Sequence, residues 1–260
     1  MKKFLAICLV LVTVLAIALP SMVLASNTGT AGVNGSVPQV PVLSSISATS
    51  GTPHATGAGV VDVSETLTGS SFDTDPTAVV TVTITGTGVT ADVVSVDSPT
   101  QITATFHLAA GPTTTSGIRD VYVHQSGRDS TDTVTFTVNG YIAITAPSAI
   151  SMGVMTVGGT TIKNSTTPGT VETNDSSTSV LAKDVKVSNA GKMDTVGDGS
   201  GTLLSNKFQI SQTNGSYANA DGGFSYTNPT SLPLYVSQQV VSGDTAGSYQ
   251  ITITFTGSAN

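Results

Sequence analysis

The amino-acid sequence predicts an all-β protein, built from two β-sandwich domains that follow a cleaved export signal. Three observations carry this prediction. Apolar side chains recur at every second position in many short segments, threonine fills the positions between them, and no segment after Ala25 combines a helical period with helix caps. A period of two places one set of side chains on a core and the other in water, where β-branched threonine suits an extended backbone.

Residues 1–25 form the predicted signal peptide. Lys2 and Lys3 give a basic start, residues 4–19 are apolar, Pro20 breaks the helix, and Val23-Leu24-Ala25 offers a small-residue cleavage site. As a helix, about 16 apolar residues span only about 24 Å, which is short of a hydrocarbon core of about 30 Å. We therefore expect cleavage, an extracellular or cell-surface location, and no stable membrane insertion of the mature chain.

The composition of the mature chain excludes several classes of chemistry. The single cysteine, Cys8, leaves with the signal, so neither disulfides nor thiolate sites are available. Removing Lys2 and Lys3 leaves seven basic against sixteen acidic side chains, a net charge of −9. An acidic balance of this kind argues against nucleic acid and anionic lipid as partners.

Residues 26–40 lack an apolar period and are rich in small turn formers, which predicts a flexible leader. Strand signals with turn residues between them then follow from residue 41 to residue 138. The seven predicted strands cover residues 42–48, 60–68, 78–85, 89–96, 101–108, 118–125 and 132–138. Seven short strands in about 100 residues are typical of an immunoglobulin-like sandwich.

Three segments of this first domain resemble the IPT/TIG family, an immunoglobulin-like fold. Residues 63–72 (VSETLTGSSF) are similar to its strand followed by T-G-S-x-F, residues 98–104 (SPTQITA) to its S-x-T-Q-I-x-A strand, and residues 117–123 (GIRDVYV) to its G-x-x-D-V-x-V strand. Phe136-Thr137-Val138 closes the domain as the family does. The resemblance implies a surface, adhesive, spacer or transcription-factor module, so the fold does not carry over one function.

Asn139-Gly140 has two interpretations. The pair is a strong hairpin signal, which would join residues 132–138 directly to residues 141–146. Alternatively it marks a domain boundary, because the family pattern ends at Val138 and the remaining 120 residues could not be added to one sandwich of normal size. We favour the boundary, with a second β-sandwich domain over residues 141–260.

The second half shows strand signals separated by long polar loops. Strands are predicted at residues 142–144, 180–187, 208–210 and 232–236, and most clearly at 249–256, where Tyr249, Ile251, Ile253 and Phe255 share one face. Loops are predicted at residues 158–179, 189–206 and 213–230. The last strand resembles the closing motif of WxL domains, which hold proteins noncovalently to bacterial cell walls. Phe255 stands where that family has tryptophan, and the chain has no tryptophan.

The loop at residues 217–229 (YANADGGFSYTNP) is the predicted ligand-binding surface. Ring faces interleaved with amides and a carboxylate suit sugar or peptide recognition. The candidate contacts are Tyr217, Asn219, Asp221, Phe224, Tyr226 and Asn228. The alternative is that Phe224 and Tyr226 pack beneath the loop as a small satellite core.

No catalytic or metal-binding constellation stands out, so we predict no catalytic residue, no metal and no cofactor. His54, His107 and His124 are expected at the surface, although they offer metal ligands. No G-x-S-x-G or S-x-x-K motif occurs, and the only glutamates, Glu65 and Glu172, fall in different domains. The acidic segments 73–75 and 194–198 offer oxygen ligands for calcium, but turn formation is the alternative that we favour.

These observations lead to three hypotheses of function. The first is a non-enzymatic binding or adhesion module at the bacterial surface, with a cell-wall component, a glycan or another surface protein as partner. The second is a structural subunit of a surface layer or filament, which would self-associate by strand addition. The third is an extracellular hydrolase, which no motif supports.

Overall fold

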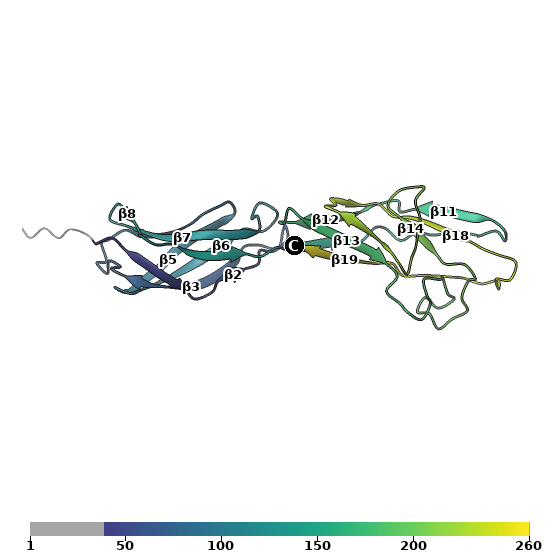
Figure 1. Cartoon of the computed structure of the whole chain (residues 1–260), viewed down its shortest axis with the longest axis horizontal. Coiled ribbons are helices and arrows are strands. Elements are labelled where there is room, and N and C mark those ends of the chain that lie inside the picture. The colour runs from purple at the N-terminus through teal and green to yellow at the C-terminus, as the bar shows by residue number, and fades with distance from the viewer. Residues whose placement is uncertain (1–38, 260) are drawn as a thin grey trace, which may run out of the picture. The chain divides into compact units, whose positions relative to one another are not determined.

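The computed structural model describes residues 39–259, and every one of them lies in a strand, a turn or an irregular segment, with no helix among them. The prediction of an all-β protein is therefore confirmed for this part of the chain (Figure 1). No stretch of these residues is a helix long and apolar enough to cross a membrane. The predicted signal peptide, and the leader up to Pro38, lie outside the described residues.

The first half forms two facing sheets whose strands match the sequence prediction closely. One sheet has the order β1-β3-β6-β5, with β1 at Val42–Ile46, β3 at Val61–Ser70, β5 at Val89–Ser98 and β6 at Gln101–Leu108. The other has the order β2-β9-β7-β4, with β2 at Ser50–Gly51, β4 at Val80–Ile84, β7 at Gly117–Gln125 and β9 at Val134–Val138. The short β8, Arg128–Asp129, pairs with the end of β7.

Both sheets contribute alternate side chains to one hydrophobic cluster. In β6 the residues Ile102, Ala104, Phe106 and Leu108 are fully buried, while the residues between them are not. Phe106 meets Phe136 of the other sheet edge to face, with ring centroids 5.2 Å apart. The period of two in the sequence thus becomes the inner face of a sandwich.

Asn139 and Gly140 separate β9 from β10, Ile142–Thr145, and these two strands lie in different sheets. The hairpin interpretation of this pair is therefore wrong. The side chain of Asn174 holds the connection, because it donates to the carbonyl oxygens of Thr114 and Asn139 and accepts the N–H of Tyr141. The buried Asn174 amide thus supplies hydrogen-bond partners for the main-chain groups of this connection, and no hairpin turn is needed to pair them.

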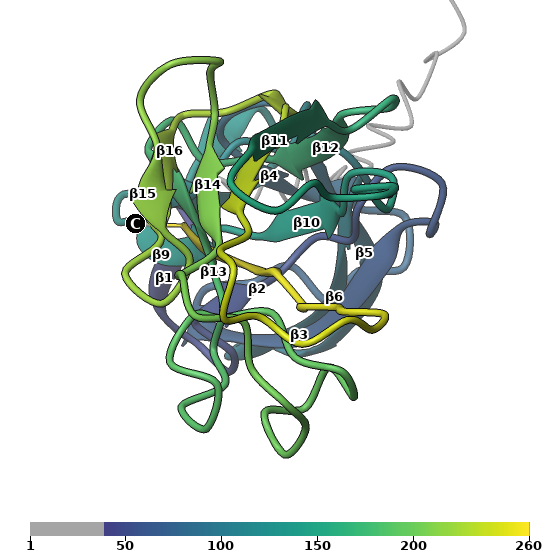
Figure 2. The ribbon, with the colours of Figure 1, turned by 90° about the vertical axis from the view of Figure 1, so that its right-hand side faces the viewer.

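The second half contains three short antiparallel sheets. Their orders are β10-β12-β17, β11-β18-β14-β15 and β16-β13-β19. Figure 2 shows β14 beside its neighbour β15. The strands not yet given are β11 at Thr160–Asn164, β12 at Gly169–Thr173, β13 at Thr178–Lys183, β14 at Gln209–Ser211, β15 at Ala218–Asn219, β16 at Phe224–Thr227, β17 at Ser231–Leu232, β18 at Tyr235–Gln239 and β19 at Thr254–Ala259. A second hydrophobic cluster fills this half and shares no residue with the first.

Three expectations for the second half are wrong in part. The predicted loop at residues 158–179 contains β11 and β12, and the predicted loop at 213–230 contains β15 and β16. In β11 and β12, Thr, Gly and Asn make up three of the five residues each, which weakens the strand signal. In β15 and β16, the strands have only two and four residues. The predicted strand at residues 249–256 begins only at Thr254, because residues 251–253 have no neighbouring strand with which to pair.

Candidate functional site

Two aromatic rings of the predicted ligand-binding loop pack into the protein interior. Tyr226 is 3% exposed, its hydroxyl donates to the carbonyl of Pro233, and burial raises its pKa. Phe224 packs against it with ring centroids 4.9 Å apart, and Tyr226 lies 6.5 Å from the ring of Phe255. A ring buried this deeply has no face free for a ligand, so Tyr226 follows the alternative interpretation, that of a packed core.

The other residues of this loop lie closer to the surface. Asn228 forms a turn with φ of 46°, and its side chain accepts the N–H of Thr178 at 2.8 Å. Asp221 pairs with Lys207, which holds the pKa of the Asp221 carboxyl below its usual value. The hydroxyl of Tyr217 donates to Asn214, and Asn219 lies exposed on the edge strand β15. A ligand-binding role for Tyr217, Asn219 and Asp221 stays a prediction.

The acidic segments that offered calcium ligands are engaged with their own main chains. A carboxylate oxygen of Asp73 accepts the N–H of Asp75, and Asp75 in turn accepts the N–H and hydroxyl of Thr77. Asp194 is fully buried and accepts the N–H groups of Val196, Gly197 and Gly199. Within residues 39–259 no group of three or more His, Asp or Glu side chains is placed to hold a metal.

The two glutamates also bond to their neighbours. Glu65 is buried in β3, where one of its oxygens accepts the Ser47 hydroxyl and the Ala48 N–H. Glu172 of β12 accepts the Tyr141 hydroxyl at 2.6 Å and also the N–H of Thr56. They lie in different sheets, so the structure does not bring them together as a catalytic pair.

His107 yields a prediction about pH. It lies on β6, its Nδ1 is 2.7 Å from Asp62, and its Nε2 is 3.2 Å from Asp92. The hydrogen bond with Asp62 raises the pKa of His107 above its usual value of about 6.5. The stabilisation from this pair is complete below the unfolded pKa and is lost as the pH rises through the folded pKa.

An NMR titration of the imidazole should give a pKa above 6.5 for His107, and the substitution Asp62→Asn should lower it. The matched control is Asp129→Asn, which removes the carboxylate beside His124 and should leave the His107 pKa unchanged. An unchanged His107 pKa in Asp62→Asn would contradict the pairing.

A large cavity lies in the second half, and we call it the apolar cleft. Its volume is about 790 Å³. The floor consists of apolar side chains that come from β18 and from the segments around β14; they are Met193, Leu204, Phe208, Leu234, Val236 and Val240. Two irregular segments border it: the first rim is residues 146–155, which follow β10, and the second rim is residues 244–253, which precede β19.

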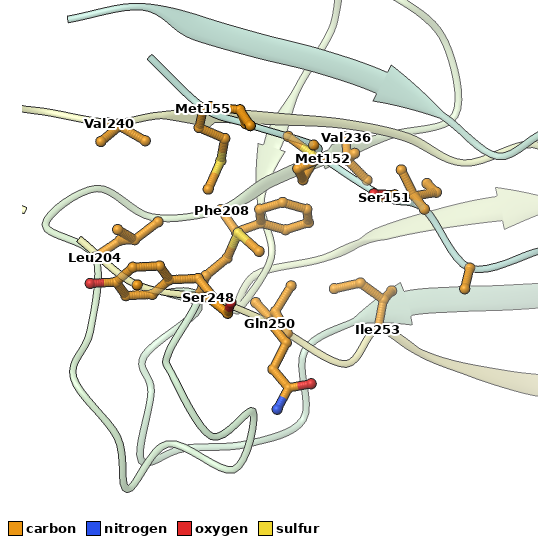
Figure 3. A pocket seen from close by; sticks show the side chains of 18 of the residues that line it. Ser151, Met152, Met155, Leu204, Phe208, Val236, Val240, Ser248, Gln250 and Ile253 are labelled. Atoms are coloured by element: carbon orange, nitrogen blue, oxygen red, sulfur yellow. The ribbon is translucent and has the colours of Figure 1, made fainter. Parts of the chain in front are cut away.

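Figure 3 shows how the two rims present their side chains. Met152 and Met155 of the first rim lie on one side of the cleft, Ile253 of the second rim lies on the other, and Phe208 lies between them in this view. Val154, beside the opening, is 98% exposed. A fully exposed valine next to an open apolar cavity extends the apolar surface outward, as binding surfaces do.

Part of the main chain in each rim lacks a protein partner. Within the described chain, residues 149–155 form no main-chain hydrogen bond, and neither do Ile251 and Thr252. Half-buried Ile251 and Ile253 alternate with exposed Thr252, which is a strand pattern without a strand neighbour. Unpaired N–H and C=O groups at such an edge accept either water or an added strand.

Hydrogen bonds to Asp194 and to the loop that follows it hold the second rim in place. The main chains of Asp194 and Gln250 exchange two hydrogen bonds, of 3.0 and 2.8 Å. The Gln250 side chain also donates to the carbonyl of Val196. The buried Asp194 carboxylate therefore fixes the loop, and the loop fixes the rim.

Asp244 is the only charged residue among those that line the cleft, and it is already engaged. It accepts the N–H and hydroxyl of Ser205 and the N–H of Val241. The hydroxyl of Ser205 is the main reason that the pKa of Asp244 is lowered. Tyr249 donates its hydroxyl to the carbonyl of Thr245 at 2.6 Å. The cleft therefore offers apolar surface and main-chain groups, with little charge.

The cleft was not predicted from the sequence, although the positions of the methionines point to it. The chain has five methionines, and the three that follow the predicted signal peptide, Met152, Met155 and Met193, all line the cleft. Flexible, polarisable methionine is common on surfaces that adapt to apolar partners. The sequence did not predict that the three lie together, because about 40 residues separate Met193 from the other two.

The fold and the cleft define a class: an all-β protein of antiparallel sheets with an open apolar cavity. No family model matches the chain, and no curated protein does. Among solved structures, the Yersinia pseudotuberculosis adhesin InvE is 16% identical, covers 85% of this chain and 58% of its own, and has a TM-score of 0.33. The secreted serine protease VesC from Vibrio cholerae is 8% identical, covers 80% and 49%, and has a TM-score of 0.22. This chain spans less than two thirds of either protein, and similarities this distant carry no argument about its function.

Proposed function

We propose that the protein is an exported, non-enzymatic binding module of the bacterial surface, and that the apolar cleft is its binding site. The single observation that carries the proposal is an open apolar cavity bordered by two stretches of main chain, residues 149–155 and residues 251–252, that have no main-chain hydrogen bond. The IPT/TIG assignment of residues 41–138 and the WxL likeness of the second half remain part of the proposal, and the surface location rests on the predicted signal peptide.

A protein segment suits the cleft better than a glycan does. Sugar sites combine aromatic platforms with several free polar groups, whereas Asp244 and the Tyr249 hydroxyl are already hydrogen-bonded within the protein. Methionine and isoleucine side chains match apolar side chains, and free main-chain groups match another main chain. The same features support the alternative function, that of a subunit of a surface layer or filament.

A blocked cleft tests the proposal. Ser151 is exposed and lines the cleft, so Ser151→Trp should fill the opening without removing a core side chain. We expect a random peptide library selected on the mature chain, residues 26–260, to yield uncharged peptides with apolar residues at alternate positions. Their binding should fall at least about tenfold in Ser151→Trp, because the indole occupies the space that the peptide needs.

The matched control is Ser242→Trp, an exposed serine of the same half that does not line the cleft; it should bind as the unsubstituted chain does. A glycan array measured in parallel covers the sugar hypothesis. Glycan binding that Ser151→Trp leaves intact, together with no selected peptide, would reject the cleft as the binding site.

A further inference from the structure

The cleft requires an occupant with three properties. Its main chain must be extended, to reach the unpaired groups of residues 149–152 and of Ile251 and Thr252. Its side chains must be apolar at every second position, because only one face of an added strand meets the apolar floor. It must carry little charge, because only Asp244 among the lining residues is charged.

The leader lies outside the described residues, and as a whole it lacks an apolar period, but its last part has the sequence of such an occupant: it is uncharged, and three of its four alternate residues from 31 to 37 are apolar. Residues 26–38 (SNTGTAGVNGSVP) contain no charged side chain. The odd-numbered positions from 31 to 37 hold Ala31, Val33, Gly35 and Val37. The even-numbered positions between them hold Gly32, Asn34 and Ser36. Proline occurs only at the end of the segment, at residue 38, so the N–H groups before it are free to pair.

We propose that residues 31–37 of a second copy enter the apolar cleft as an added strand between its two rims. The side chains of Ala31, Val33 and Val37 then face the floor, and those of Asn34 and Ser36 face solvent. The inference rests on the proposed function of the cleft and names its partner. Repeated from copy to copy, the same contact links the molecules in a chain, as the filament hypothesis requires.

The attachment of the leader favours a second copy over the same molecule. Gln39 is held at one end of β7, where the Gln125 side chain donates to its carbonyl. The other end of β7 leads to the second half, since the N–H of Ser116 donates to Asn174. Residues 31–38 reach at most about 28 Å, and the nine residues of β7 alone span about 30 Å. A segment of this length is therefore shorter than the strand that separates Gln39 from the second half, which favours the cleft of a second copy.

A synthetic peptide of residues 28–38 tests the inference directly. It is labelled with fluorescein and titrated with a chain that begins at Gln39, which retains both hydrophobic clusters because they are built from residues 43–255. We expect saturable binding by fluorescence anisotropy, and at least about tenfold weaker binding to Ser151→Trp. A peptide with Val33→Asp and Val37→Asp should bind at least about a hundredfold more weakly, because it would bury two unpaired charges.

The matched control peptide carries the same two charges on the other face, through Asn34→Asp and Ser36→Asp, and should bind within about threefold of the original. The mature chain should likewise associate with rising concentration in sedimentation velocity, and Val33→Asp with Val37→Asp should abolish this association. Equal binding of the two charged peptides, or no binding of the original, would overturn the inference. If selected library peptides still bind the cleft, only the inference about residues 31–37 is rejected. If the library peptides also fail to bind, the proposed function of the cleft is rejected as well.

Discussion

Replacing Phe106 by alanine should lower the free energy of unfolding by about 3 to 5 kcal/mol, the usual cost of truncating a buried phenylalanine. Phe106 is fully buried at the centre of β6 and meets the ring of Phe136 edge to face across the two sheets. The substitution removes the hydrophobic burial, the ring contact and the packing around them, and leaves a cavity between the sheets. Urea unfolding followed by circular dichroism measures the loss.

The matched control is Thr105→Ala, the neighbouring residue of β6 on the other face, which is half-buried. It should change the free energy of unfolding by less than about 1 kcal/mol. A transition of the second half should also keep its midpoint, because its hydrophobic cluster contains no residue of the first. A loss in Phe106→Ala no larger than that in Thr105→Ala would contradict the buried position of this ring.

Replacing Asp194 by alanine should destabilise the second half by about 3 kcal/mol and disturb the apolar cleft as well. The carboxylate is fully buried and accepts three main-chain N–H groups, which the alanine would leave without a partner. Gly197 and Gly199 adopt φ of 84° and 83° to bring their N–H groups to it. Because Asp194 also pairs with Gln250, the second rim should move, and peptide binding in the cleft should weaken.

The dependence of stability on pH should reveal the contribution of the same Asp194 carboxylate. Burial by itself raises the pKa of Asp194, but the main-chain hydrogen bonds outweigh burial and leave the pKa below its usual value. A carboxyl with a lowered folded pKa contributes stability above its unfolded pKa of about 3.9 and loses it as the pH falls towards the folded pKa. The unfolding free energy of the natural sequence should therefore fall below about pH 4, and less steeply in Asp194→Ala.

The control for both measurements is Asp198→Ala, in the same loop. Asp198 is exposed, and its carboxylate accepts the N–H and hydroxyl of Ser200. It should cost much less stability than Asp194→Ala and leave peptide binding in the cleft unchanged. Equal effects of the two substitutions would show that the buried hydrogen bonds of Asp194 do not organise the loop.

The strands of the first half were predictable because their signal is local. In β6, the alternation of Ile102, Ala104, Phe106 and Leu108 with polar residues requires only that neighbouring side chains point to opposite faces. The strands β11 and β12 were not predicted, because both are rich in threonine and neither alternates apolar with polar residues over its length. Their place in the sheets comes from pairing with β18, β17 and β10, and such partners are distant in sequence.

The candidate site, too, was only partly predictable from local sequence. The sequence pointed to Tyr226 because aromatic and amide residues cluster around it, yet the ring fills the core and bonds to Pro233. Composition does not distinguish a ring that faces a ligand from one that faces a neighbouring strand. Met152 and Met193 meet in the cleft only after chain folding, so no local pattern joins them.

The sequence by itself determined the all-β class and the inner faces of the first sandwich, because a period of two acts between adjacent residues. Only the tertiary structure decided that Ile251 and Ile253 have a strand pattern but no strand beside them, and that a cavity of about 790 Å³ opens there. The physical reason is that a β-strand is completed by hydrogen bonds to another segment. Which segment lies alongside depends on how the whole chain packs.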